Sequence, residues 1–146
     1  MLQKLNELGY KGLPHLPYSL DLLLRDYNFF KHLASKNAYV PYSRFAVGAA
    51  LECRGGVVFT GCNIENAALG STICAERTAA CKAISEGRRD FVRIAIYGEG
   101  EGYCYPCGAC RQFLAEFAPE MEVLSAKKDR YVSNKLSELL PHTFQF

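Results

Sequence analysis

Apolar and polar positions along the middle of the chain predict strands interleaved with helices. Residues 45–53 and 57–62 are β-rich, and the Arg-Gly-Gly turn between them predicts a hairpin. A helix is expected over residues 73–86, because Gly87 is well placed to end it. Residues 91–97 form the best single run of strand-forming residues and predict a fully buried strand.

The pattern continues towards the C-terminus. A second helix is expected from Pro106 to the stop at Pro119. The last strands are expected at residues 122–127 and 131–134, followed by a short turn at residues 136–141. Strands that alternate with helices favour an α/β layered fold.

The N-terminal part of the chain has a weaker pattern. Residues 1–17 contain two glycines and two prolines, and we treat them as an extension of uncertain structure. Ser19 is expected to cap a helix over residues 20–35, whose apolar side chains share one face. Residues 18–146 should then form a single domain, since a chain of 146 residues suits one core.

The composition narrows the class of protein. Seventeen basic and fifteen acidic side chains give a formal charge of +2, which does not indicate a nucleic-acid or membrane partner. No apolar run approaches the roughly 20 residues that span a bilayer, and the start of the chain lacks the apolar core of a signal peptide. We therefore expect a soluble cytoplasmic protein.

The cysteines are the candidate metal-binding residues. Their number is seven, and an odd count argues against a fully paired disulfide framework. Cys107 and Cys110 lie three apart at one predicted helix start, and Cys74 lies at another. Helix N-termini favour thiolates. Three thiolates leave one position of a tetrahedral zinc ion open, as in a catalytic site.

Two neighbours of Cys74 extend this interpretation. Glu76 is two residues from a ligand on the same helical turn, so it could reach a water at the metal without binding the metal. Three thiolates also place excess negative charge on zinc. Arg77 could offset that charge by donating hydrogen bonds to thiolate sulfur.

Other interpretations of the cysteines remain open at this point. Cys53, Cys62 and Cys81 are more simply small core residues. A C-x-x-C pair can be redox-active or structural. Cys104 could be a fourth ligand that closes the site, or part of an iron–sulfur run, although the C-x-x-x-C-P that should follow is missing.

Residues 74–77, Cys-Ala-Glu-Arg, and 106–112, Pro-Cys-Gly-Ala-Cys-Arg-Gln, together resemble the cytidine deaminase family. Cysteine as the first ligand resembles the small homotetrameric members that act on free nucleosides. Residues 41–50 resemble the family's first-strand signature, and residues 63–67 resemble its nucleoside-binding segment. The matches run in family order through nearly the whole domain. Leu69, where many relatives have Tyr, and the loop at residues 98–105 depart from the family pattern.

The resemblance implies a three-layer α/β/α fold with a mixed five-stranded sheet. It implies one zinc ion per chain, bound by Cys74, Cys107 and Cys110, with Glu76 as the proton shuttle and Arg77 beside the ligands. The implied reaction is hydrolysis of cytidine and deoxycytidine to uridine and deoxyuridine, with release of ammonia, in pyrimidine salvage.

The resemblance also implies how substrate is held. Asn63 and Glu65 would bind the ribose hydroxyls, the Ala75 backbone would meet the pyrimidine edge, and Phe45 would stack on the ring. Phe144 would enter the site of a neighbouring subunit in a homotetramer with shared sites. Two rival classes remain: a deaminase of single-stranded nucleic acid or of another aminopyrimidine, and a non-catalytic zinc or iron–sulfur module.

Overall fold

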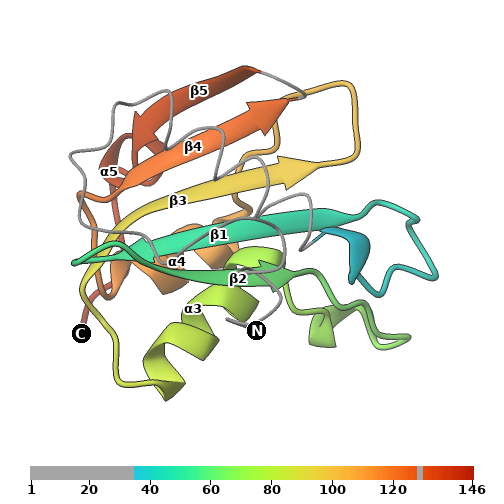
Figure 1. The fold of residues 1–146 in the computed structure, drawn as a ribbon, viewed down its shortest axis with the longest axis horizontal. Coiled ribbons are helices and arrows are strands. Elements are labelled where there is room, and N and C mark those ends of the chain that lie inside the picture. The colour runs from blue at the N-terminus through green and yellow to red at the C-terminus, as the bar shows by residue number, and fades with distance from the viewer. Residues whose placement is uncertain (1–34, 128–129) are drawn as a thin grey trace, which may run out of the picture.

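A mixed five-stranded sheet forms the centre of the molecule in the computed structural model, which describes residues 35–127 and 130–146 (Figure 1). The strands are β1 (Val47–Cys53), β2 (Val57–Cys62), β3 (Phe91–Gly98), β4 (Glu122–Lys127) and β5 (Arg130–Lys135). Their order is β2-β1-β3-β4-β5, with β3 and β4 parallel and the other neighbours antiparallel. The predicted mixed five-stranded α/β sheet is therefore confirmed.

Within the described part of the chain, two helices cover one face of this sheet. They are α3 (Ala75–Ser85) and α4 (Gly108–Ala115), and their buried residues join the main core with alternate residues of β1, β3 and β4. Ala50, Ala95 and Leu124 point to the other face, where they form a smaller cluster. The predicted helix over residues 20–35 and the N-terminal extension lie outside the described residues, apart from Ser35.

Small residues let α3 approach the sheet closely, and this positions the start of the helix. Ala75, Ala79, Ala80 and Ala83 are all fully buried. On β2, a Cβ added to Gly61 would lie 2.5 Å from the Ala79 nitrogen and still closer to the Ala75 carbonyl oxygen. Only glycine at residue 61 fits this approach, which fixes the first turn of α3 against the sheet.

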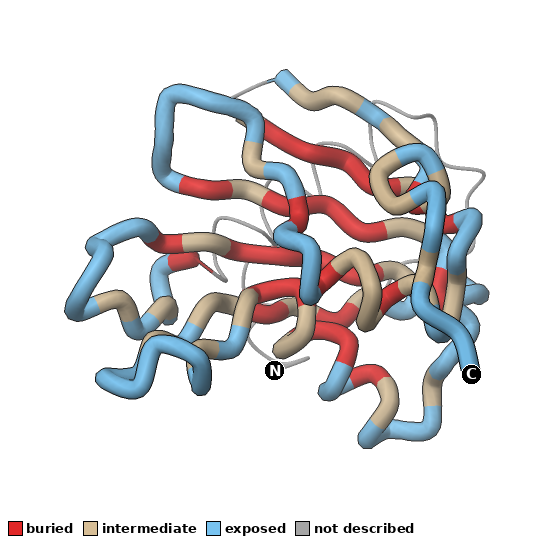
Figure 2. Tube along the Cα trace, turned by 180° about the vertical axis from the view of Figure 1, so that it is seen from behind, coloured by how far each residue is buried: buried red, intermediate tan, exposed pale blue. Residues whose placement is uncertain are grey.

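Burial is concentrated in the central strands, and the loops at the strand ends are exposed (Figure 2). Several boundaries differ from prediction. The first strand begins at Val47 instead of residue 45, because Arg44 has a φ of 58° and turns the chain just before it. The turn expected at residues 136–141 begins with a short helix, α5 (Leu136–Leu139).

The prediction that three cysteines are core residues is only partly correct. Cys53 is buried and Cys62 is half-buried, but Cys81 is exposed. The face of α3 that carries Ala79, Ala80 and Ala83 packs on the sheet, and Cys81 therefore lies on the solvent side. In the described part of the chain, no helix has both the length and the apolar character needed to cross a membrane.

Candidate metal centre and active site

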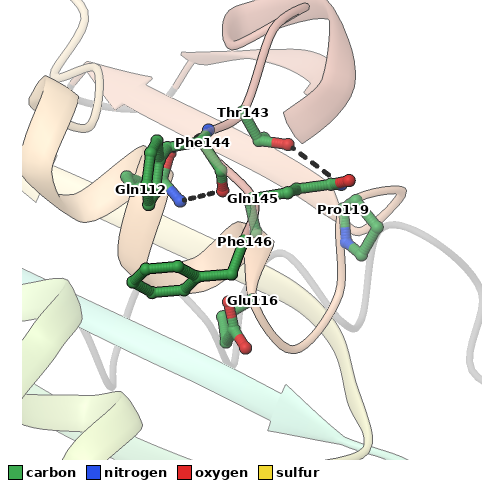
Figure 3. Close-up of a pocket in the computed structure, with 8 residues that line it drawn as sticks. Gln112, Glu116, Pro119, Thr143, Phe144, Gln145 and Phe146 are labelled. Carbon is green, nitrogen blue, oxygen red and sulfur yellow. Dashed lines mark hydrogen bonds between the residues drawn. The ribbon is translucent and has the colours of Figure 1, made fainter.

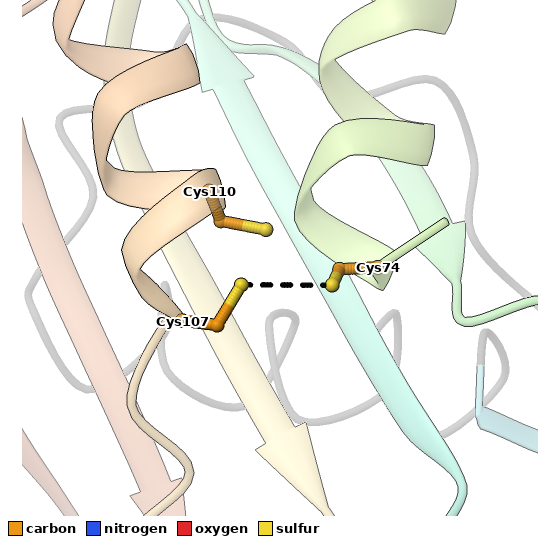
Figure 4. Close-up of side chains that lie close together, drawn as sticks. All are labelled: Cys74, Cys107 and Cys110. Atoms are coloured by element: carbon orange, nitrogen blue, oxygen red, sulfur yellow. Dashed lines mark hydrogen bonds between the residues drawn. The ribbon is translucent and has the colours of Figure 1, made fainter. Parts of the chain in front are cut away.

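The three predicted zinc ligands meet between the starts of α3 and α4 (Figure 4). Cys74 is the N-cap of α3, Cys107 is the N-cap of α4, and Cys110 lies in the first turn of α4. Their sulfur atoms all lie within 4.8 Å of one another, and Cys74 and Cys107 are 3.7 Å apart. A tetrahedral zinc ion with bonds of about 2.3 Å separates its sulfur ligands by about 3.8 Å, so the site fits zinc.

Hydrogen bonds within the site favour the thiolate form of Cys74, which is the form that binds a metal cation. Arg77 donates through Nη2 to the Cys74 sulfur at 3.4 Å and to the Thr72 carbonyl at 3.1 Å. A hydrogen bond from Cys110, aided by Arg77, lowers the pKa of Cys74 to about 5. In the same pair, the pKa of Cys110 is raised by its hydrogen bond with Cys74. These hydrogen bonds favour the thiolate form of Cys74, and the Arg77 guanidinium lies against its sulfur atom.

Arg77 has further donor capacity towards this anionic site. Its Nε is buried and has no hydrogen-bond partner among the described residues. A buried donor left in this way normally has an anion or a polar group close by. Full ionisation of the three thiols on metal binding would strengthen the negative charge that this guanidinium faces.

Cys104 does not belong to the ligand group, so the interpretation that it closes the site is not supported. It lies outside the cluster formed by Cys74, Cys107 and Cys110. Burial raises the pKa of its thiol to about 12, and the charges of Glu76 and Cys74 add to this effect.

Glu76 is a buried carboxyl group next to the cysteine cluster, where it forms a hydrogen bond with Cys110. Its side chain belongs to the first turn of α3, and the residue is only 4% exposed. Burial is the largest cause that raises the pKa of Glu76 to about 7, and the negative Cys74 raises it further. A carboxyl with this pKa can accept and release a proton near neutral pH, as a general acid–base group must.

Asn63 holds the segment that leads into β1. Its Oδ1 accepts the Val47 N–H at 2.9 Å, and its Nδ2 donates to the Phe45 carbonyl at 2.9 Å. The Phe45 N–H in turn donates to Ser43 Oγ at 3.0 Å. The backbone of Phe45 is therefore held on both sides, while the residue as a whole remains 40% exposed.

Glu65 holds the preceding turn. Its Oε2 accepts the backbone N–H groups of Tyr42 at 2.9 Å and Ser43 at 3.2 Å. The Ser43 hydroxyl is the largest cause that lowers the pKa of Glu65. Both residues assigned to the ribose thus also shape the turn that carries Phe45. The sequence motif alone did not indicate this second role, because the partners lie 16 to 23 residues apart.

Phe144 lies apart from the cysteine cluster of its own chain. An open pocket of about 570 Å³ lies between α4 and the C-terminal tail, lined in part by Gln112, Glu116, Pro119, Phe144 and Phe146 (Figure 3). None of the three zinc ligands lines it. The Gln112 carboxamide binds the backbone of Phe144, a contact that sequence analysis missed although Gln112 belongs to the recognised motif.

A comparison with protein families identifies the chain. The model of the cytidine and deoxycytidylate deaminase zinc-binding region matches residues 26–126. The chain belongs to this family. The matched span contains both helix starts that carry the three cysteines, so zinc is the metal that this site binds.

Individual relatives agree with the family assignment. A cytidine deaminase from Halalkalibacterium halodurans is 50% identical over 119 residues, which cover 76% of this chain and 86% of the relative. One from Sporosarcina psychrophila is 49% identical over 113 residues, covering 76% and 83% of the two chains. The crystal structure of cytidine deaminase from Burkholderia pseudomallei matches with a TM-score of 0.77 and 40% identity, covering 87% of this chain and all of that one.

Proposed function

We propose that this protein hydrolyses cytidine and deoxycytidine to uridine and deoxyuridine, releasing ammonia, as a step of pyrimidine salvage. One observation carries the proposal: three converging cysteine thiols lie beside a buried glutamate in a chain of the deaminase family. Bound zinc supplies Lewis acidity, which makes water a nucleophile at neutral pH.

Glu76 moves the protons of the reaction. As a carboxylate it accepts a proton from the attacking water, and it then donates to N3 of the base. Glu76, a carboxylate again, then takes the remaining proton from the hydroxyl group on C4. It delivers this proton to the departing amine as the C4–N bond breaks and the C4 carbonyl forms. Burial raises the pKa of Glu76 to about 7 in the metal-free site, which favours both directions of transfer near neutral pH. Burial keeps bulk water from exchanging these protons before the amine leaves.

The substrate is held by groups around this centre. Asn63 keeps one N–H beyond its two backbone bonds within the described residues, and the Glu65 carboxylate has more acceptor sites than the two backbone N–H groups occupy, so each can bind a ribose hydroxyl. Ala75 begins α3, where backbone N–H groups have no intrahelical acceptor and can meet the pyrimidine edge. The partly exposed ring of Phe45 stacks on the base.

We also propose a homotetramer with shared active sites. Tyr39, Ile64 and Ile73 are joined by backbone bridges, and all three are exposed apolar residues. Leu69, 72% exposed, lies in the same loop region. Exposed apolar side chains gathered in this way are typical of subunit contacts. Phe144, 67% exposed, would complete the site of a neighbouring subunit.

The location proposed for the protein is the cytoplasm, and we expect no nucleic-acid or membrane partner. All seven cysteines lie within the described ranges and are free thiols, which suits a reducing compartment. The formal charge of +2 offers no strong electrostatic attraction to nucleic acid or to an anionic membrane.

A direct assay tests the activity. Cytidine absorbance should fall on addition of the purified protein and should stop falling when a chelator removes the metal. Glu76→Ala should keep zinc but lose nearly all turnover, and Cys74→Ala should lower the zinc content per chain. Cys81→Ala, an exposed thiol on the same helix, is the matched control and should change neither quantity.

Two results would contradict the proposal. A zinc-loaded protein that does not consume cytidine would be a binding module or would act on another aminopyrimidine. Near-normal turnover in Glu76→Ala would remove this residue from the mechanism. Elemental analysis and the absorption spectrum of the purified protein would distinguish zinc from a coloured iron–sulfur cluster.

A further inference from the structure

Gly98 lies at the end of β3, opposite Val47 of β1, at a point where two other side chains leave no room for one of its own. A Cβ at this residue would lie 2.6 Å from Cζ of Phe45 and 3.0 Å from the Cys104 sulfur. Carbon atoms in contact are normally about 3.5 to 4.0 Å apart. The Phe45 ring therefore occupies space that exists only because residue 98 is glycine.

Gly100 borders the same ring from another side. A Cβ there would lie 3.0 Å from Cε2 of Phe45. The Gly100 N–H donates to the Gly98 carbonyl at 2.9 Å, and the Glu99 N–H donates to the Ala46 carbonyl at 3.0 Å. The turn at residues 98–100 is thus fastened to the start of β1 while it passes along the edge of the ring.

Backbone strain does not explain why these two positions are glycine. The described glycines with a positive φ are Gly55, Gly56 and Gly87, and neither Gly98 nor Gly100 is among them. Alanine can adopt a backbone conformation with a negative φ without the left-handed penalty. The cost of a methyl group at residue 98 would therefore come from its contacts alone.

Among the described residues, the Phe45 ring is confined by the turn at residues 98–100 and is partly open to solvent. Its backbone is held by Ser43 and Asn63 on either side, so the residue cannot simply withdraw. On the side of the sheet it meets the turn at residues 98–100, where the half-buried Cys104 also lies close to residue 98. Phe45 as a residue is 40% exposed, and a methyl group at residue 98 would push its ring towards solvent.

We propose that Gly98 is a positioning residue for substrate. Because Gly98 has no side chain, the Phe45 ring packs directly against the end of β3 and leaves the space that the pyrimidine base fills. This inference rests on the proposed function, in which Phe45 stacks on the base. Gly98 acts through Phe45 and touches no reacting atom, so it should govern base binding more than the chemical step.

The experiment compares glycine-to-alanine variants of the full-length zinc-loaded enzyme. Gly98→Ala should raise KM for cytidine by roughly 5- to 20-fold while kcat changes by less than about twofold. Gly100→Ala should raise KM by a smaller factor, since its nearest contact is 3.0 Å. Gly102→Ala is the matched control in the same loop, because a Cβ there meets no described atom within 4 Å.

A compensating substitution separates this role from a general loss of structure. Leucine at residue 45 lacks the outer ring atoms that meet Gly98. In a Phe45→Leu background, Gly98→Ala should therefore raise KM by less than about twofold. Calorimetric titration with uridine should reproduce the pattern as a weaker Kd in Gly98→Ala, independently of turnover.

The outcomes distinguish the inference from the proposed function. If the unaltered enzyme does not deaminate cytidine, the function fails. If it does, and the Gly98→Ala and Gly100→Ala variants both keep KM within about twofold, the positioning role of Gly98 is wrong. An equal rise in KM in the presence and absence of Phe45→Leu would also overturn it. If Gly98→Ala does not fold, Gly100→Ala supplies the same comparison.

Discussion

The side chain of Gln112 holds the backbone of Phe144 by both of its polar groups. Nε2 donates to the Phe144 carbonyl at 3.1 Å, and Oε1 accepts the Phe144 N–H at 2.9 Å (Figure 3). The tail is thereby attached to α4, and its aromatic rings remain outside the core. The rings of Phe144 and Phe146 meet edge to face with their centroids 5.2 Å apart, and Phe144 is 67% exposed.

We expect this attachment to support substrate binding. Gln112→Glu keeps an acceptor for the Phe144 N–H but loses the donor to its carbonyl, so the tail should loosen and KM for cytidine should rise roughly fivefold. Removal of residues 144–146 should raise KM at least as much. Gln145→Ala, whose side chain bonds only to the tail among the described residues, should leave KM unchanged. An unchanged KM after truncation would make the tail merely structural.

Arg77 should determine how tightly the cysteines hold zinc. Arg77→Gln removes the positive charge beside the Cys74 sulfur, and loss of such a partner typically costs about 10- to 100-fold in metal affinity. Competition with a chromogenic chelator would measure the change. Lys82→Gln removes a charge from the last turn of the same helix and should leave zinc affinity unaltered. Equal affinities in all three proteins would exclude a role for Arg77.

Much of the fold and the metal centre could be predicted because short stretches of sequence carry the patterns that indicate them. Cys107 and Cys110 lie three apart at a helix start, and that spacing alone brings their sulfur atoms together. The strands of the sheet were likewise marked by continuous apolar runs. The position of Cys74 beside them depends on how α3 packs on β2, which the small residues of α3 only suggested.

The parts that could not be predicted depend on contacts between distant segments. The bond between Gln112 and Phe144 joins residues 32 positions apart, and the turn that Glu65 binds lies more than 20 positions upstream. The exposure of Cys81 follows from which face of α3 meets the sheet. No spacing rule specifies such pairings, because each is set by the packing of whole elements.

Because the pKa of Glu76 is raised, the free energy of unfolding of the metal-free protein should depend on pH. An acid whose folded pKa, about 7, exceeds its usual 4.5 stabilises the fold most when it is protonated. Its contribution is fully present below pH 4.5 and is lost as the pH rises to about 7. The loss should amount to about 3 kcal/mol at most, from 1.36 kcal/mol per pKa unit.

Urea unfolding of chelator-treated protein between pH 4.5 and 7.5 would measure this effect against Glu76→Gln. Cys74 shifts stability in the opposite sense, because its lowered pKa favours the fold as the pH rises from about 5. That contribution is present in both proteins and largely cancels in the comparison. The difference in unfolding free energy should therefore change with pH, and a difference that stays constant would show that Glu76 is not held protonated by burial.

We expect Asn63 to stabilise the fold as well as to support substrate binding. Asn63→Ala removes the acceptor for the Val47 N–H and the donor to the Phe45 carbonyl at the start of β1. We expect a loss of about 1–3 kcal/mol in unfolding free energy together with a higher KM, because the stacking ring loses its backbone support.

Asn66→Ala is the control for this prediction, since the Asn66 side chain makes one exposed bond, to the Ala68 N–H at 2.9 Å, in the same segment. It should cost less stability and leave KM unchanged. If Asn63 bound only the ribose, its removal would raise KM without altering the unfolding midpoint. A parallel loss of both quantities is expected instead, because the same carboxamide that would meet the ribose also fixes the backbone beneath the base.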